Sequence, residues 1–301
     1  MTTTQNLVVR HRYTILFAFV ALSVFLWLRP LISNWVMALN RDAHTHVLLI
    51  PPLSMSLIYL KRKELSSVAK YGGSSALVFL AAALLLRLLT FSNHIDISPG
   101  NRLSLDIFTF VLWCVGAVLL CFGVRAVETI LFPVCLLFLL VPLPEQLLSA
   151  TIYYLQHASA WASGILFRIA NVPVTQDGIM LSIPGLDIEV AQECSSIRSS
   201  MMLMITTLVV AHLSLNSWWR RLLLVVAAIP LSVAKNAVRI FTIAELGTRV
   251  DPGYLDGWLH HNGGIVFLAL AIFAVLLLLW LLRRSELRAP IANLEGEGRV
   301  S

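Results

Sequence analysis

Near its C-terminal end the chain reads HHNGGIVFLALAIFAVLLLLWLLRR from His260 to Arg284. No charged residue interrupts the run between Gly263 and Leu282, and two arginines follow it directly. A helix needs about 20 apolar residues to cross the hydrocarbon core of a bilayer. This run therefore predicts a transmembrane helix with two histidines at one end and two arginines at the other.

The composition of the whole chain agrees with that reading. Of its 301 residues, 58% are hydrophobic and 13% are charged, whereas a soluble domain carries roughly 25% charged residues. The chain is therefore predicted to be an integral membrane protein in contact with the lipid bilayer. Its net charge of +6 does not indicate nucleic-acid binding, because basic residues of membrane proteins gather in cytoplasmic loops.

Similar apolar runs recur along the chain, and they predict an all-α integral membrane fold with about eight transmembrane helices. The predicted spans cover residues 14–29, 46–60, 74–92, 104–124, 127–142, 195–215, 222–243 and 263–282.

Basic residues at alternate boundaries predict the orientation of these spans. They are Arg10, Arg12, Lys61, Arg62, Lys63, Lys70, Arg125, Arg220, Arg221, Arg283 and Arg284. The positive-inside rule places all of them in the cytoplasm if both termini are cytoplasmic. We expect residues 1–284 to form the polytopic membrane domain and the polar residues 285–301 to form a disordered cytoplasmic tail.

The segment between the fifth and sixth spans has a different character. The stretch Glu145–Ile169 mixes aromatic and polar residues in an amphipathic pattern, which favours a helix lying in the outer membrane interface. The stretch Thr175–Ala191 then alternates around Pro184-Gly185, which predicts a short β-hairpin before the sixth helix.

Three kinds of ionisable residue stand at the outer boundaries of the last three spans. Cys194 precedes the sixth span, Arg239 lies near the outer end of the seventh, and His260 and His261 precede the eighth. Ionisable groups in or at membrane spans are costly and mark functional sites by default. The predicted orientation brings all of these residues to the same side of the bilayer.

Each of these residue types suits one step of acyl transfer. A cysteine thiolate is a nucleophile, and a nearby imidazole can take its proton and later return it to a leaving amine. A guanidinium keeps its charge and can stabilise an oxyanion. Arg198 and Asn236, one helical turn from Cys194 and Arg239 respectively, are candidate supporting residues. The spacing leaves open which of the two histidines would carry the proton.

Other interpretations of the same residues stay open at this point. A cysteine often acts as a small hydrophobic residue, and an arginine near a helix end can reach the headgroups. The alternative function is a non-catalytic permease, or a scaffold for envelope polysaccharide assembly, with Arg87 and Lys235 lining a polar pathway. A membrane acyltransferase that uses His260 is a third class.

No cofactor or metal is expected. His44 and His46 form a His-Thr-His sequence, but no cluster of carboxylates completes a metal site around it.

Three sequence motifs resemble those of the exosortase/archaeosortase family of membrane cysteine transpeptidases. The chain reads VAQECSSIR at residues 190–198, NAVRI at 236–240 and HHNGGIVF at 260–267. The stretches His46–Pro51 and Val141–Pro144 also fit, and the resemblance extends from about residue 40 to residue 282.

The resemblance implies a function in protein sorting. The family's substrates are exported proteins with a C-terminal signal (of the PEP-CTERM type in bacteria) made of a short motif, a transmembrane helix and a basic tail. The resemblance implies a plasma (inner) membrane protease that cleaves this signal on the extracytoplasmic face and passes the protein to an acceptor.

The resemblance also assigns roles to individual residues. It makes Cys194 the nucleophile, Arg239 the stabiliser of the transition state and His260 the general acid and base. His260 is preferred because the family's histidine stands four residues before a glycine, here Gly264; His261 is the second choice. Ser196 stands where the family usually has glycine, a departure that removes no catalytic group.

Overall fold

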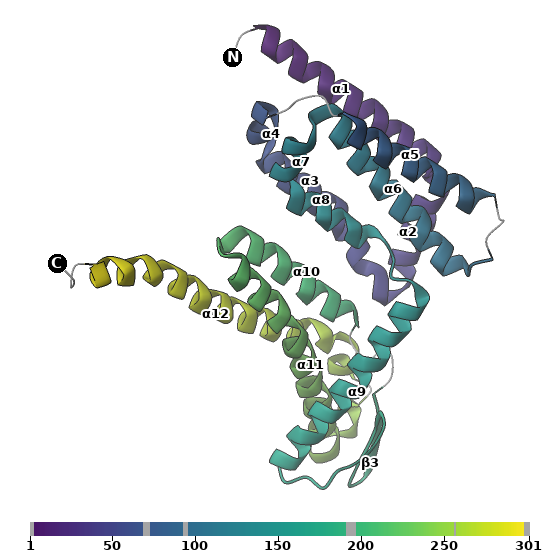
Figure 1. Ribbon diagram of the computed structural model, residues 1–301. Helices are drawn as coiled ribbons and strands as arrows, with labels where there is room; N and C mark the ends of the chain where they lie inside the picture. The colour runs from purple at the N-terminus through teal and green to yellow at the C-terminus, as the bar shows by residue number, and fades with distance from the viewer. Residues whose placement is uncertain (1–2, 69–72, 93–95, 191–196, 256, 298–301) are drawn as a thin grey trace. The chain divides into compact units, whose positions relative to one another are not determined.

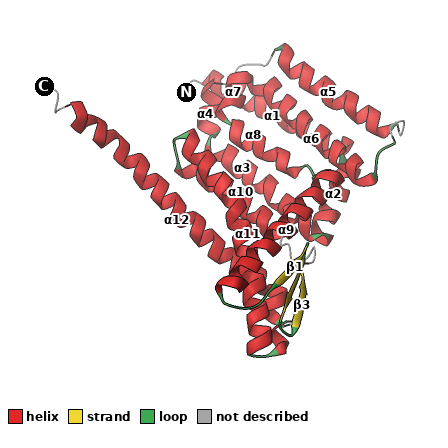
Figure 2. Ribbon diagram, turned by 60° about the horizontal axis from the view of Figure 1, so that its bottom comes forward, coloured by secondary structure: helices red, strands yellow, loops and turns green. Residues whose placement is uncertain are grey.

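The computed structural model describes residues 3–68, 73–92, 96–190, 197–255 and 257–297 (Figure 1). The chain divides into two compact units, Met1–Leu148 and Ser149–Ser301. Figure 2 shows that helices dominate and that the strands form one small sheet. The all-α architecture predicted from the apolar runs is thus confirmed.

The first unit consists of helices that follow the predicted apolar runs. They are α1 (Thr3–Leu26), α2 (Leu28–Asn40), the 3₁₀ helix η1 (Asp42–Leu49), α3 (Ile50–Leu60), α4 (Arg62–Val68), α5 (Ser74–Phe91), α6 (Pro99–Phe122), α7 (Val124–Thr129), α8 (Leu131–Leu137) and the 3₁₀ helix η2 (Phe138–Leu140).

Helix α6 is the most buried helix of this unit, and both of its ends have a local cause. Ser98 caps its N-terminus by accepting a hydrogen bond from the Asn101 N–H, and Pro99 occupies the first turn, where its missing N–H costs nothing. The helix ends at Gly123, whose φ of 81° favours glycine. In its middle, Trp27 donates a 2.8 Å hydrogen bond to Thr109, which ties α6 to the break between α1 and α2.

An ion pair joins α5 to α6. Arg87 lies 2.7 Å from Asp106, and Thr90 donates a 2.6 Å hydrogen bond to the same carboxylate oxygen. A charged side chain within a span needs such a partner. The pairing gives Arg87 a structural role, so it offers no support for a polar transport pathway through this residue.

The second unit contains the sheet and the last helices. Its elements are α9 (Glu145–Ile169), which begins in the first unit, β1 (Thr175–Asp177), β2 (Met180–Ile183), β3 (Leu186–Glu189), α10 (Ile197–Ser214), α11 (Trp218–Arg249), the 3₁₀ helix η3 (Pro252–Tyr254) and α12 (Trp258–Glu297).

Helices α10, α11 and α12 pack against one another around an apolar cluster. At one end, the Glu286 carboxylate accepts hydrogen bonds from the backbone N–H groups of Asn216 and Ser217, in the turn between α10 and α11. Glu286 also pairs with Arg220 at 3.5 Å. The C-terminal part of α12 therefore lies beside this turn. The first turns of α10 lie at the other end of α10, against the middle of α11, and α12 begins after η3, which packs against α11.

The number of predicted spans agrees with the structure. Among the described residues, six helices are long and apolar enough to cross a membrane, or up to eight if each of two bent helix pairs is one span. The six are Ala43–Leu60, Ser74–Phe91, Pro99–Phe122, Ile197–Ser214, Trp218–Arg249 and Gly263–Leu287.

Two predicted spans differ from the structure in detail. The first continues beyond residue 29, because α1 is followed by α2 after a bend of 74°. The fifth, predicted over 127–142, is not one helix but the short segments α7, α8 and η2. Pro133 lies in the first turn of α8, where its missing N–H removes no intrahelical hydrogen bond. A single helix over 127–142 would place Pro133 in its interior and would lose a hydrogen bond there.

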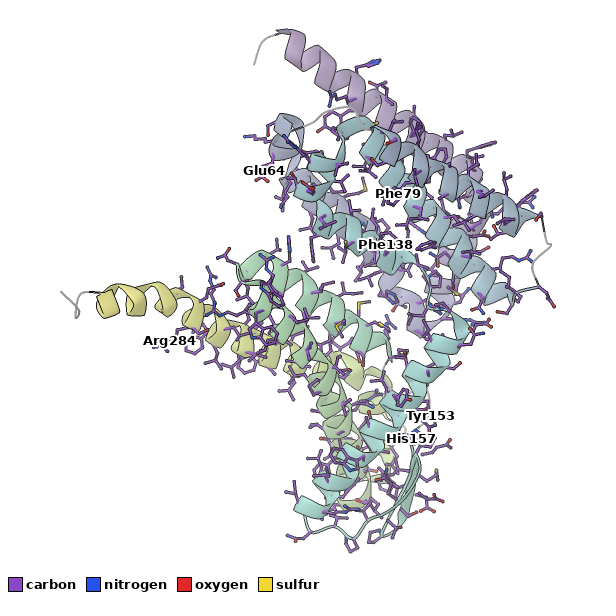
Figure 3. All side chains as sticks on the ribbon, viewed as in Figure 1. Glu64, Phe79, Phe138, Tyr153, His157 and Arg284 are labelled. Atoms are coloured by element: carbon purple, nitrogen blue, oxygen red, sulfur yellow. The ribbon has the colours of Figure 1, made fainter. Side chains whose placement is uncertain are left out.

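The predicted amphipathic helix and hairpin are both present. Helix α9 covers Glu145–Ile169, and its exposed face carries Tyr153 next to His157 (Figure 3), with ring centroids 3.9 Å apart. Its position in the membrane interface stays a prediction. The hairpin is β2–β3, where Ile183 faces Leu186 across Pro184-Gly185.

The sheet contains one strand more than the hairpin that was predicted. β1 pairs with β2 in antiparallel fashion, so the order is β1-β2-β3. Asp177 pairs with Met180, so Gly178 is the first central residue of a two-residue turn. Its φ of 58° suits glycine, which is favoured at this position of tight hairpin turns.

The predicted boundary between residues 284 and 285 lies inside a helix. Helix α12 passes it and continues to Glu297. The division of the chain at this boundary, and the state of the tail in solution, stay predictions.

Candidate active site

The sheet of the second unit lies beside α9 and α11 (Figure 2). Alternate residues of β2 are buried, so the sheet has one apolar face, as expected for a half-buried sheet. That face shares a cluster with side chains of α9 and α11. The buried members of the cluster are Ala160, Phe167, Leu181, Ile183, Val190, Ile240 and Ala244.

Two hydrogen bonds hold the chain just beyond β3. The Val190 N–H donates to the Ile179 carbonyl at 3.0 Å, and the Val190 carbonyl accepts from Gln156 Nε2 of α9 at 2.8 Å. Val190 is fully buried. The first residue of the predicted nucleophile motif is thus fixed to both the sheet and α9. Cys194 itself lies outside the described residues.

Polar residues on one face of α11 contact polar residues of α10. Lys235 Nζ donates to Ser199 Oγ, and Ser232 Oγ donates to Ser200 Oγ. Lys235 and Asn236 are buried. These contacts join the first turns of α10, which follow the nucleophile motif in the chain, to the middle of α11.

Arg239 lies one helical turn beyond Lys235 and Asn236 on α11 and is half-buried. It lines a pocket of about 220 Å³, together with residues of β3, three residues of the next turns of α11, and Leu255. Because guanidinium groups keep their charge, this pocket has a fixed positive charge on one wall.

The connection between α11 and α12 folds back onto α11. Leu255 lies so close to Gly247 that a β-carbon at Gly247 would collide with it. The Asp251 side chain accepts a 2.8 Å hydrogen bond from the Gly253 N–H and thereby caps the N-terminus of the short helix η3. This packing fixes where α12 begins relative to the end of α11.

The predicted site residues take the following places. Asn236 and Arg239 lie in the C-terminal half of α11, and Arg198 is the exposed second residue of α10. His260 and His261 lie in the first turn of α12. The backbone thus places the start of α10 against the middle of α11, one turn before Arg239. The start of α12 follows η3, which packs against α11.

Sequence reasoning missed the residues that support this arrangement. Gln156 lies within the stretch predicted as an amphipathic helix, but that pattern does not indicate its hydrogen bond to Val190. The sequence likewise does not indicate that Ser199 is the partner of Lys235. Both contacts join residues more than 30 positions apart. The one sequence signal for these contacts is that Gln156 and Lys235 are polar residues among apolar neighbours, which indicates that they need polar partners.

His44 and His46, the histidines of the His-Thr-His sequence, lie in the 3₁₀ helix η1. His44 and His46 are buried, and within the described ranges no group of three or more metal-ligating side chains occurs.

The fold defines a multi-span membrane protein in which the buried Lys235 and the half-buried Arg239 lie on the helix that packs against α10 and α12. A family model described as Transmembrane exosortase (Exosortase_EpsH) matches residues 35–279, which is most of the chain. The chain belongs to this family of transmembrane exosortases. Membership supports, at the level of the family, a role as a membrane protein-sorting transpeptidase. No curated protein and no solved structure matches the chain.

Proposed function

We propose that the protein is a membrane-embedded cysteine transpeptidase that cleaves the C-terminal sorting signal of exported proteins. The observation that carries the proposal is the family match over residues 35–279, which includes Cys194, Arg239 and His260. The packing of the α10 start against the middle of α11 supports it, because the α10 start follows Cys194 in the chain and Arg239 lies one turn beyond this contact.

The proposed reaction begins at the thiol of Cys194. His260 takes the thiol proton, and the thiolate attacks the carbonyl carbon of the scissile peptide bond. The resulting oxyanion is stabilised by the guanidinium of Arg239, which lines a pocket between α11 and β3. The C–N bond then breaks, and the leaving amine receives the proton from His260.

The second half of the reaction transfers the exported protein. The acyl group is now a thioester of Cys194, and a nucleophile of the acceptor attacks it while His260 takes the nucleophile's proton. The C–S bond breaks and the thiol is restored. Arg198 and Asn236 are proposed to support this site, and His261 is the alternative proton carrier.

The proposed orientation follows from the charge distribution. Both termini face the cytoplasm and the site faces outward from the plasma (inner) membrane, because the basic boundary residues then all lie inside. The proposed substrates are exported proteins whose C-terminal signal combines a short motif, a transmembrane helix and a basic tail.

Trapping the thioester tests this function directly. Membranes that contain the protein and a tagged exported protein with such a signal are expected to hold a covalent adduct of the two, visible on a denaturing gel. Hydroxylamine should release the adduct, because it cleaves thioesters. An adduct that persists in hydroxylamine, or one that also forms with Cys194→Ala, would contradict a thioester at Cys194.

A second prediction concerns Gln156, which holds Val190. Gln156→Leu leaves a buried carbonyl without its donor, at a cost of about 1–3 kcal/mol. We expect the rate of signal cleavage to fall about tenfold, because 1.4 kcal/mol corresponds to a factor of ten in rate. The measurement is the rate of cleavage in isolated membranes at equal protein level.

Gln146→Leu is the matched control on the same helix. Gln146 accepts a hydrogen bond from Asn101 at an exposed position, and its loss should change the rate less than twofold. Equal rates for the two variants would show that the Gln156–Val190 contact does not position the site.

A further inference from the structure

The strand β3 has a free edge. In the order β1-β2-β3 only one side of β3 is paired. The hydrogen bond from Val190 to Ile179 shows which residues of this segment point toward β2. Since hydrogen-bonded and non-hydrogen-bonded pairs alternate in antiparallel sheets, the backbone groups of Asp187 and Glu189 point away from β2. Within the described part of the chain, no other strand or helix supplies hydrogen bonds to these groups.

The pocket of about 220 Å³ lies along this free edge. β3 forms one wall with its residues Leu186 to Glu189, and α11 forms the other with Ile240, Ile243 and Ala244. Leu255 closes one side. At about 30 Å³ for each water molecule, the volume corresponds to about seven waters, which is enough for one large side chain. The pocket is thus apolar, bounded by unpaired backbone groups on one side and by Arg239 at its end.

Three classes of occupant differ in how well they match these walls. A small anion would meet the Arg239 guanidinium but also the carboxylates of Asp187 and Glu189, which are exposed on β3. A lipid chain would suit the apolar wall but would leave the edge of β3 without hydrogen-bond partners. An extended polypeptide matches both features, because its backbone can pair with β3 and every second side chain can point to the same face.

We propose that an extended segment of the substrate polypeptide pairs with β3 as a fourth strand and inserts an apolar side chain into this pocket. The proposal rests on the proposed function. Backbone pairing at Asp187 and Glu189 supplies affinity without dependence on sequence, and the apolar pocket selects one side chain. Arg239 at the end of the pocket then lies next to the bound backbone, as a stabiliser of the developing oxyanion must.

Disulfide cross-linking tests the pairing without any need for cleavage. Asp187→Cys is introduced into the variant in which Cys194, Cys114, Cys121 and Cys135 are replaced by alanine. Single cysteines are then placed at successive positions of the substrate before its transmembrane helix, and a mild oxidant is added to the membranes. We expect cross-links at alternate substrate positions, with at least about a threefold difference between neighbours, because side chains alternate along a strand.

Gln176→Cys is the control on the same sheet. Gln176 is exposed on β1, at the opposite edge, and does not line the pocket. It should form no periodic cross-links with the same substrates. Cross-links at Asp187→Cys without alternation, equal cross-linking at Gln176→Cys, or no cross-links at all would overturn the pairing.

A second measurement tests the pocket itself. Ile243→Trp fills the space between α11 and β3, and we expect kcat/KM for the signal to fall about tenfold or more, mainly through KM. Ile243→Ala enlarges the pocket. The enzyme should then prefer, by kcat/KM, substrates with a larger apolar side chain at the position that enters the pocket. A change in kcat alone, with unaltered preference in both variants, would contradict a binding pocket.

The two levels of the proposal fail in different ways. If the Cys194→Ala protein still cleaves the signal, the proposed function is wrong, and the proposed pairing of a substrate strand with β3 is wrong as well. If Cys194→Ala stops cleavage but the cross-links show no alternation, the function stands and the docking mode is wrong.

Discussion

Replacement of Cys194 by alanine is expected to stop signal cleavage, with the rate falling by at least about 10⁴-fold. The loss is large because no other group of the proposed site can form the thioester, so the reaction would have to proceed by direct attack of water or acceptor. The protein should still insert in the membrane at a normal level, since alanine replaces a residue of similar size. The measurement is the ratio of cleaved to uncleaved substrate in cells, followed over time.

The other cysteines provide the control for this experiment. Cys114, Cys121 and Cys135 are free cysteines within the apolar runs of the first unit, and Cys121 is buried. A variant that keeps Cys194 and replaces these three should retain most of the activity. In that variant, a thiol reagent that does not cross the membrane should inhibit from the outside. Normal cleavage by Cys194→Ala, or inhibition only from the cytoplasmic side, would refute the nucleophile or its proposed location.

Replacement of Arg239 by lysine is expected to lower the cleavage rate by about 10²–10³-fold, the usual cost of losing one oxyanion donor. The charge is kept, but the planar guanidinium with its fixed donors is lost. Stability should change little, because Arg239 is only half-buried and lysine retains most of the side chain. The measurement combines cleavage rates in membranes with the melting temperature of the purified protein.

Arg249→Lys is a matched control ten residues further along the same helix. Arg249 is largely exposed and pairs with Glu245 at 2.8 Å, and such surface pairs contribute little. Its replacement should leave the rate within about twofold. If Arg239→Lys were as active as Arg249→Lys, a role of Arg239 in stabilising the transition state would be wrong.

The helices of this protein were largely predictable from its sequence. In the run that ends at Arg284, apolar residues continue for the full width of a bilayer, and no soluble fold would leave such a surface in water. The bounds of α9 and the hairpin at Pro184-Gly185 were also predictable, because amphipathic and alternating patterns reflect local geometry. The break of the fifth span was harder to place, since Pro133 ends a helix without indicating how the next one begins.

The candidate site was predictable as a set of residues but not as a set of contacts. The motifs around Arg239 and His260 follow from the resemblance to a family, and they lie on α11 and α12, which pack against each other. The hydrogen bonds of Gln156 with Val190 and of Lys235 with Ser199 could not be read from the chain. Each joins distant residues, and no local pattern specifies which polar groups will meet.

The sequence by itself determined the membrane class, the approximate number of spans and the residues that could carry chemistry, because hydropathy, charge and motifs are local properties of the chain. Only the tertiary structure decided that β3 has a free edge, and that the wall facing this edge is apolar and ends at Arg239. These features depend on how α11 packs against the sheet and on how Leu255 folds back over Gly247. Such packing results from the fit of side chains that are far apart in the sequence, so it appears only in the folded protein.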